Sequence, residues 1–345
     1  MIIADRAIGS AHPPFVIAEL SANHNGSLDR ALEIMTAASQ AGADAVKLQT
    51  YTANTITIDH DGPGFTIEEG LWDGYTLHAL YDEAHTPWEW HEALFAHGRE
   101  LGLIVFSSPF DTSAVDFLEG LDTPAYKIAS FELIDLPLIR KVAATGKPMI
   151  MSTGIANLAD IDAAVTAARE AGASDIALLH CTSGYPTPAE EADLRTIPNL
   201  AEAFGLVTGL SDHTPGVGAP VAAVALGAAI VEKHITLNRA DGGPDAAFSL
   251  EPAEFSVLCD SVKVGWQALG RVRYEKTAAE TGNAQFRRSL YVVADMAAGD
   301  VLTAENLRSI RPGFGLAPKY FDVLLGKRIN RDVARGTPMS WDLIA

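Results

Sequence analysis

The segment AIVEKHITLNRADGGPDAAFSLEP, residues 229–252, decides the fold. It begins as an apolar strand, becomes polar at Glu232 and His234, and continues into a Gly-rich acidic loop. Side chains along a strand alternate between its two faces, so Glu232 and His234 point one way and Lys233 points the other. A carboxylate and an imidazole at the end of an apolar strand are costly unless they are paired or used. We therefore interpret this strand end as part of a functional site.

The same design recurs along the chain. Short apolar segments that end in polar residues alternate with helical segments, which indicates a parallel sheet covered on both faces. There are eight of them: 15–20, 45–50, 104–109, 125–130, 148–153, 176–181, 206–212 and 229–235. Eight such units over about 270 residues favour an α/β fold of the (β/α)8 TIM barrel type over an open sheet. No GxGxxG motif follows the first strand, which weighs against a dinucleotide-binding fold.

Composition and charge narrow the function classes. The chain has 345 residues with a net charge of −19, which argues against nucleic acid or an anionic membrane as a general partner. An anionic ligand must therefore be held by a local basic pocket. Two cysteines do not imply a disulfide framework. No basic-then-apolar leader and no apolar run of about 18 residues are present, so we expect a soluble cytoplasmic protein.

Two further regions stand apart from the barrel pattern. A polar linker at 273–285 is expected to separate a barrel domain at 1–272 from a small module at 286–345. Within that module the pattern that begins at Asp295 and Gly299 recurs at Asp332 and Gly336. About 60 residues is small for an independent core, so we expect the module to lean on a barrel, its own or a partner's. The segment 51–85 exceeds a normal loop and predicts a lid or a substrate wall.

Each predicted strand ends in polar side chains, and in a barrel these strand ends meet at one face, where active sites of this fold lie. His213 and His234 end neighbouring strands and can hold one divalent ion, with water and substrate oxygens completing its shell. Two strong ligands favour Mn²⁺, or alternatively Mg²⁺ or Co²⁺, over a structural zinc. The alternative is a pair of hydrogen-bonded structural histidines.

Lysines are rare inside proteins, and Lys47 and Lys127 end two of the strands. With nearby serine hydroxyls they can surround a phosphate and a carboxylate. Alternatively they are salt-bridge partners of Glu19 or Glu232, or one of them forms a Schiff base. Asn23 and Asp245 are either substrate contacts or ordinary turn residues.

At these motifs the chain resembles the sialic acid synthase family. The matching pieces are IAELSANHNG (17–26), KLQTY (47–51), SSPFD (107–111), YKIAS (126–130), MSTG (151–154), HCTSGYPTP (180–188), GLSDHT (209–214), EKHITL (232–237) and GPDAAFSLEP (243–252). RRSL (287–290) and IRPG (310–313) resemble the family's antifreeze-like SAF (β-clip) domain. The SANH and GGPDAAFS forms are similar to the pseudaminic acid synthase branch rather than to the neuraminate branch.

The resemblance implies that phosphoenolpyruvate condenses with 2,4-diacetamido-2,4,6-trideoxy-L-altrose, with C–O cleavage and release of phosphate. It assigns phosphoenolpyruvate binding to Lys47, Ser108, Lys127, Ser130, Ser152, Ser183 and Ser211. It assigns sugar binding to Asn23, Gln49, Asp245 and Arg311, and catalysis to Glu19, Tyr185 and Glu232. The choice of acid/base between Glu19 and Glu232 stays open. Arg311 implies that the SAF module of a partner reaches over the barrel, in a domain-swapped homodimer.

Three rival functions stay open at this point. A legionaminate or neuraminate synthase would use a manno-configured amino sugar in the same pocket. A metal-dependent aldolase that uses pyruvate would need no phosphate pocket. A non-catalytic sugar-binding protein would need neither the histidine pair nor two strand-end lysines.

Overall fold

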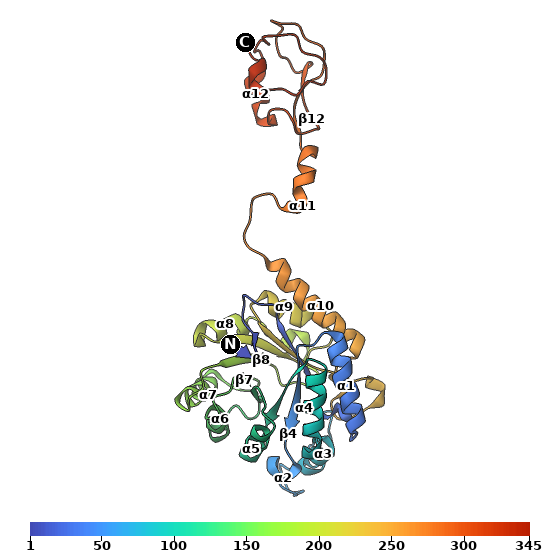
Figure 1. The fold of residues 1–345 in the computed structure, drawn as a ribbon, viewed down its shortest axis with the longest axis vertical. Helices are drawn as coiled ribbons and strands as arrows, with labels where there is room; N and C mark the ends of the chain where they lie inside the picture. The colour runs from blue at the N-terminus through green and yellow to red at the C-terminus, as the bar shows by residue number, and fades with distance from the viewer. The chain divides into compact units, whose positions relative to one another are not determined.

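The computed structural model describes residues 1–345, which divide into two compact units, Met1–Gly270 and Arg271–Ala345. In the larger unit eight parallel strands close a barrel, which confirms the predicted (β/α)8 fold (Figure 1). These strands are β3 (Phe15–Glu19), β4 (Ala45–Thr50), β5 (Ile104–Pro109), β6 (Tyr126–Ile128), β7 (Met149–Ser152), β8 (Ile176–Cys181), β9 (Val207–Asp212) and β10 (Ile230–His234). A short hairpin, β1 (Ile2–Ile3) and β2 (Arg6–Ala7), precedes them.

Helices cover the outside of the barrel (Figure 1). They are α1 (Leu28–Ala41), α4 (His91–Glu100), α5 (Thr112–Gly120), α6 (Leu136–Ala143), α7 (Leu158–Glu170), α8 (Thr196–Phe204), α9 (Gly218–Ala225) and α10 (Pro252–Leu269). Ser27, Asp111, Asp135 and Asn157 start four of them and accept hydrogen bonds from first-turn amides. Such caps satisfy N–H groups that have no partner within the helix. No helix is both long and apolar enough to cross a membrane.

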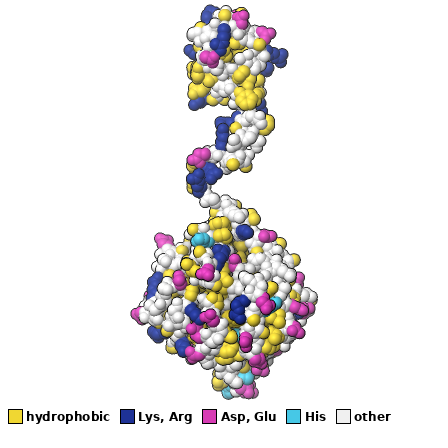
Figure 2. All heavy atoms as spheres, in the orientation of Figure 1, with side chains coloured by type: hydrophobic (Ala, Val, Ile, Leu, Met, Phe, Trp, Pro, Cys, Tyr) yellow, Lys and Arg dark blue, Asp and Glu magenta, His cyan; other side chains and the backbone are white.

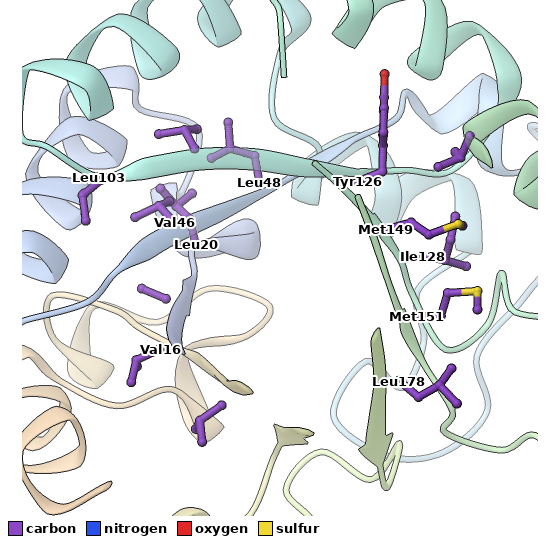
Figure 3. Packing of buried hydrophobic residues seen from close by; sticks show 14 of the residues in the cluster. Val16, Leu20, Val46, Leu48, Leu103, Tyr126, Ile128, Met149, Met151 and Leu178 are labelled. Atoms are coloured by element: carbon purple, nitrogen blue, oxygen red, sulfur yellow. The ribbon is translucent and has the colours of Figure 1, made fainter. Parts of the chain in front are cut away.

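The two-residue period of the strands sorts their side chains between two cores. The outer row packs against the helices, and Figure 3 shows part of it, including Val16, Val46, Met149 and Leu178. The inner row begins apolar, and its members fill one end of the barrel: Phe15, Ile17, Ala45, Phe106, Ala125, Ile150, Ala177, Leu179 and Ile230. Inner-facing residues are two positions apart in the sequence, and the next inner-facing residue toward the carboxyl end is polar in seven strands: Glu19, Lys47, Ser108, Lys127, Ser152, Ser211 and Glu232. The barrel therefore carries these polar groups to one end.

The long segment after β4 folds against the barrel. It contains α2 (Ala53–Ile56) and α3 (Leu77–Ala84), and a bridge pairs Thr66 with Thr76. The Trp72 indole Nε1 donates to the Pro244 carbonyl at 3.0 Å, which ties the segment to the loop after β10.

The smaller unit has an apolar core of its own, which includes Leu290, Leu307, Leu324, Ile329 and Met339. It contains α11 (Ala278–Thr281), the antiparallel pair β11 (Ser289–Val292) and β12 (Leu307–Ile310), and α12 (Phe321–Leu324). The predicted linker thus includes α11 and most of a 3-10 turn at Gly282–Phe286.

The internal repeat of the smaller unit is reciprocal in space. The Asp295 carboxylate accepts from the Arg335 amide at 2.7 Å, and the Asp332 carboxylate accepts from the Ala298 amide at 2.8 Å. Each repeat therefore caps the turn of the other, which explains why the aspartates recur at the same offset.

Candidate active site

A cavity of about 470 Å³ lies at the carboxyl ends of the barrel strands. Its wall brings together most of the predicted site residues: Lys47, Gln49, Lys127, Ser130, Ser152, Tyr185, Ser211, His213, Glu232, His234 and Asp245. On the face of the larger unit drawn in Figure 2, acidic and basic side chains are interspersed among apolar ones.

Two lysines and two glutamates form a buried charge cluster. Lys47 Nζ lies 3.1 Å from both Glu19 Oε2 and Glu232 Oε1, and Lys127 Nζ lies 3.6 Å from Glu232 Oε1. The Ser211 hydroxyl donates to Glu232 at 3.0 Å. The lysines are thus ion-pair partners of the glutamates, as one alternative held, and they also line the cavity. The cluster balances its own charge.

The members of the cluster differ in their affinity for protons. Burial tends to raise the pKa of Glu232, but Lys127 and Lys47 overcome it and hold that pKa at about 2. Burial raises the pKa of Glu19 in spite of Lys47, and the charge of Glu232 adds to the effect. Burial lowers the pKa of Lys127 to about 8, although Glu232 opposes the change. Burial tends to lower the pKa of Lys47, but the charges of Glu19 and Glu232 overcome this and raise it.

The two histidines present free nitrogen lone pairs. Their ring centroids are 5.4 Å apart. His213 Nδ1 donates to the Thr182 carbonyl at 3.0 Å, so Nε2 is the atom that carries the free lone pair when this ring is neutral. Burial tends to lower the pKa of His213, but the contact with Cys181 raises it. His234 Nδ1 is buried without a hydrogen-bond partner, and burial holds the pKa of His234 well below its ordinary value, so this ring is neutral. Two adjacent imidazoles of this kind fit a divalent ion.

The histidine pair has no third protein ligand beside it. No group of three or more His, Cys, Asp or Glu side chains is placed to hold a metal ion. Cys181 Sγ lies 3.9 Å from His213 Nδ1, on the side of the ring that faces the Thr182 carbonyl. An ion on the two imidazoles would therefore complete its shell with water and substrate oxygens.

A second polar group extends from the charge cluster toward the loop after β10. The Gln49 amide donates to Glu19 Oε1 at 2.9 Å and to the Ser21 hydroxyl at 3.0 Å, and Ser21 donates in turn to Asp245. Burial raises the pKa of Asp245, and the Ser21 hydrogen bond opposes this. The Tyr185 ring lies 4.5 Å from the His213 ring. A polyhydroxylated substrate would find donors and acceptors on this side.

Comparison with known proteins identifies the family. The NeuB family model matches residues 34–274, and the SAF domain model matches residues 287–345. The chain belongs to the NeuB family.

Two relatives and one solved structure are similar to this NeuB-family chain over most of its length. Pseudaminic acid synthase of Campylobacter jejuni is 44% identical over 93% of this chain and 94% of its own. Pseudaminic acid synthase of Helicobacter pylori is 43% identical over 96% of this chain and 97% of its own. The crystal structure of N-acetylneuraminic acid synthetase from Leptospira borgpetersenii is 30% identical, with a TM-score of 0.73 over 83% of this chain and 95% of that one.

Four predicted residues lie outside the cavity wall of this NeuB-family protein, and a fifth lies in the smaller unit. Glu19 is buried behind Lys47, and Ser108 accepts from Lys47 at 3.4 Å. Ser183 lies 4.0 Å from Cys181. The Asn23 amide donates at 2.9 Å to both the Ile235 carbonyl and the Ser249 hydroxyl, so it positions the loop after β10 instead of facing the cavity. Arg311 belongs to the smaller unit, beside Arg287 and Arg288.

The structure also adds a titratable residue that the sequence did not single out. Glu132 lines the cavity, and its Oε2 is buried without a hydrogen-bond partner. Burial raises the pKa of Glu132 to about 7, against a backbone hydrogen bond and the attraction of Lys127. The sequence feature that could have pointed to Glu132 is its position two residues after Ser130, beyond the end of β6 (Tyr126–Ile128).

Proposed function

We propose that this protein condenses phosphoenolpyruvate with 2,4-diacetamido-2,4,6-trideoxy-L-altrose to give pseudaminic acid and inorganic phosphate. The observation that carries the proposal is that one cavity holds two lysines, four serine hydroxyls and two adjacent histidines. The similarity to two pseudaminic acid synthases at 43% and 44% identity supports this acceptor. A manno-configured acceptor, as for a neuraminate synthase, is the alternative.

Phosphoenolpyruvate would bind among the lysines and hydroxyls. Lys47 and Lys127 supply positive charge, and the Ser152 hydroxyl is buried without a partner, so it is free to donate to an anionic oxygen. Ser130 and Ser211 lie on the same wall. Ser108 supports Lys47 from behind, and Ser183 would act through the loop after β8. An anion in this place would share the ammonium groups with Glu19 and Glu232.

The aldehyde of the sugar would lie at the histidine pair. His213 and His234 would hold a divalent ion, Mn²⁺ or alternatively Mg²⁺ or Co²⁺, which when bound would polarise the aldehyde oxygen. Asp245, Gln49 and Tyr185 face the same space and would orient the sugar hydroxyl and acetamido groups. Their fixed positions would present the aldehyde carbon to C3 of phosphoenolpyruvate.

The carboxyl groups divide the proton chemistry between them. C3 attacks the aldehyde, whose oxygen gains a proton, and water captures C2 and loses one before phosphate departs. Glu232 stays ionised beside two lysines, so it suits charge stabilisation at C2 rather than proton donation. Burial raises the pKa of Glu132 to about 7, so this group can carry a proton near neutral pH, and burial raises the pKa of Glu19 as well.

The decisive experiment measures phosphate release from phosphoenolpyruvate with three acceptors: the altro diacetamido sugar, its manno isomer and N-acetylmannosamine. We expect release with the altro sugar and its loss on chelation. Release with a manno sugar instead would replace the substrate and keep the reaction. Consumption of pyruvate without phosphate release would support the aldolase. Sugar binding without turnover in metal-loaded protein would support a binding protein.

The homodimer is a separate proposal. The partner subunit's Arg311 would reach the sugar site, as the family resemblance implies. Arg311→Ala should then raise the KM for the sugar while the barrel stays folded. Arg308→Ala is the matched control, because Arg308 is an exposed residue of the same unit in β12 (Leu307–Ile310). An unchanged KM for the sugar in Arg311→Ala would contradict the proposed role of the partner subunit.

A further inference from the structure

One side of the cavity is apolar. The segment after β4 contributes several large side chains to its lining, and six of them are here called the apolar wall: Ile56, Ile67, Trp72, Leu77, Leu80 and Tyr81. The same segment carries seven acidic residues, none of which lines the cavity: Asp59, Asp61, Glu68, Glu69, Asp73, Asp82 and Glu83. The segment therefore has two faces, and it turns the apolar one toward the substrate space.

The apolar wall is attached to the catalytic residues. Trp72 donates its indole N–H to the Pro244 carbonyl, next to Asp245, and its ring lies 5.7 Å from the Tyr185 ring. Tyr185 lies 4.5 Å from His213. At the other end of the wall Tyr81 packs edge-on against Tyr51 at 5.8 Å. The wall thus begins one aromatic ring away from the histidine pair and forms part of the same cavity.

The chemistry of the apolar wall separates methyl groups from hydroxyl groups. Four of its side chains have no polar atom, the indole N–H of Trp72 is already used, and the Tyr81 hydroxyl is the one polar group left on the wall. A hydroxyl group placed against such a surface loses hydrogen bonds to water without replacement. A methyl group in the same place is removed from water favourably. An aldose whose C1 lies at the histidine pair extends its C4–C6 end away from that pair.

We propose that the apolar wall is the specificity subsite for the methyl-bearing end of the acceptor, its C6 methyl and its 4-acetamido methyl. The inference rests on the proposed function and deepens it, because it assigns the choice of a 6-deoxy diacetamido sugar to the segment after β4. Apolar pockets reject an added hydroxyl by about 10-fold to 100-fold in kcat/KM. The wild-type enzyme should show a preference of that size.

The test compares two acceptors that differ at one atom. They are 2,4-diacetamido-2,4,6-trideoxy-L-altrose and 2,4-diacetamido-2,4-dideoxy-L-altrose, which carries a hydroxyl at C6. In the wall variants Ile56→Thr and Ile67→Thr the preference in kcat/KM should fall roughly 10-fold, with an unchanged KM for phosphoenolpyruvate. Ile58→Thr is the matched control, because Ile58 is 60% exposed and does not line the cavity. It should keep the wild-type preference.

The outcomes separate the inference from the proposed function. Phosphate release from neither acceptor removes the proposed function and the inference with it. Equal kcat/KM for both acceptors in the wild-type enzyme overturns the inference and leaves the function standing. A preference that Ile56→Thr and Ile67→Thr leave intact assigns the discrimination to another part of the cavity, and this too overturns the inference.

Discussion

Replacing Glu132 by glutamine should change how the stability of the protein depends on pH. Burial raises the pKa of Glu132 from 4.5 to about 7, and its Oε2 has no hydrogen-bond partner to favour the ionised form. The folded state therefore binds a proton at this site more tightly than the unfolded chain does. That contribution to stability is complete below pH 4.5 and is lost as pH rises through about 7.

The size of the effect follows from the two pKa values. A change from 4.5 to about 7, at about 1.4 kcal/mol per pH unit, corresponds to about 3 kcal/mol of lost stability in alkaline solution. Glutamine stays neutral at every pH and avoids this loss. The stability of Glu132→Gln relative to wild type should therefore rise by about 3 kcal/mol between about pH 4 and about pH 9.

Urea unfolding of the full chain across this pH range, followed by circular dichroism, measures the difference. Glu92→Gln serves as the control, because Glu92 is exposed on α4 (His91–Glu100) and should give a nearly constant difference from wild type. A difference for Glu132→Gln that is equally constant would refute the reasoning, since it would mean that Glu132 titrates alike in the folded and unfolded chains.

Two substitutions test how the barrel holds its catalytic strands. Lys233 forms a buried ion pair with Asp212 on the outer face, so Lys233→Met should cost about 3–5 kcal/mol in urea unfolding, and adding Asp212→Leu should recover part of it. An unchanged midpoint in Lys233→Met would count against the pair. A Cβ on Gly209 would lie 2.4 Å from the Ile230 carbonyl oxygen, so Gly209→Ala should destabilise by about 1–3 kcal/mol, whereas Gly218→Ala, with no atom within 4 Å, should not. Equal melting temperatures for the two glycine variants would contradict this.

The barrel and much of its polar end were predictable from local patterns. Strand periodicity alone places Glu232 and His234 on one face and Lys233 on the other, and the structure has this arrangement. The same rule orders the inner rows, because seven of the eight change from apolar or glycine to polar toward the carboxyl end of the strand, and the row of β8 ends at Cys181 instead. A closed parallel barrel then brings strand ends together whatever their separation in the chain.

The rest of the site depends on contacts that no local pattern contains. The Asn23 amide donates to the Ile235 carbonyl, 212 residues away in the chain. Because of this contact Asn23 positions a loop, although its place next to a strand end suggested a substrate contact. Trp72 reaches Pro244 across 172 residues, and contacts of this kind fix where the segment after β4 lies. Glu132 lies in a loop, where no strand or helix period predicts which way a side chain points.

The balance of charge in the cavity implies that phosphoenolpyruvate binding takes up protons. Lys47 and Lys127 are already neutralised by Glu19 and Glu232 in the free protein. A phosphate group adds about −1.5 to −2 charges and the carboxylate of the substrate adds another. This negative charge must raise the pKa values of Glu19 and Glu132 further, and that of Lys127, which lies at about 8, as well. All three changes have the same sign, so the heat of binding should depend on the ionisation enthalpy of the buffer and report net uptake near neutral pH. Proton release would mean that the substrate phosphate does not lie beside these groups.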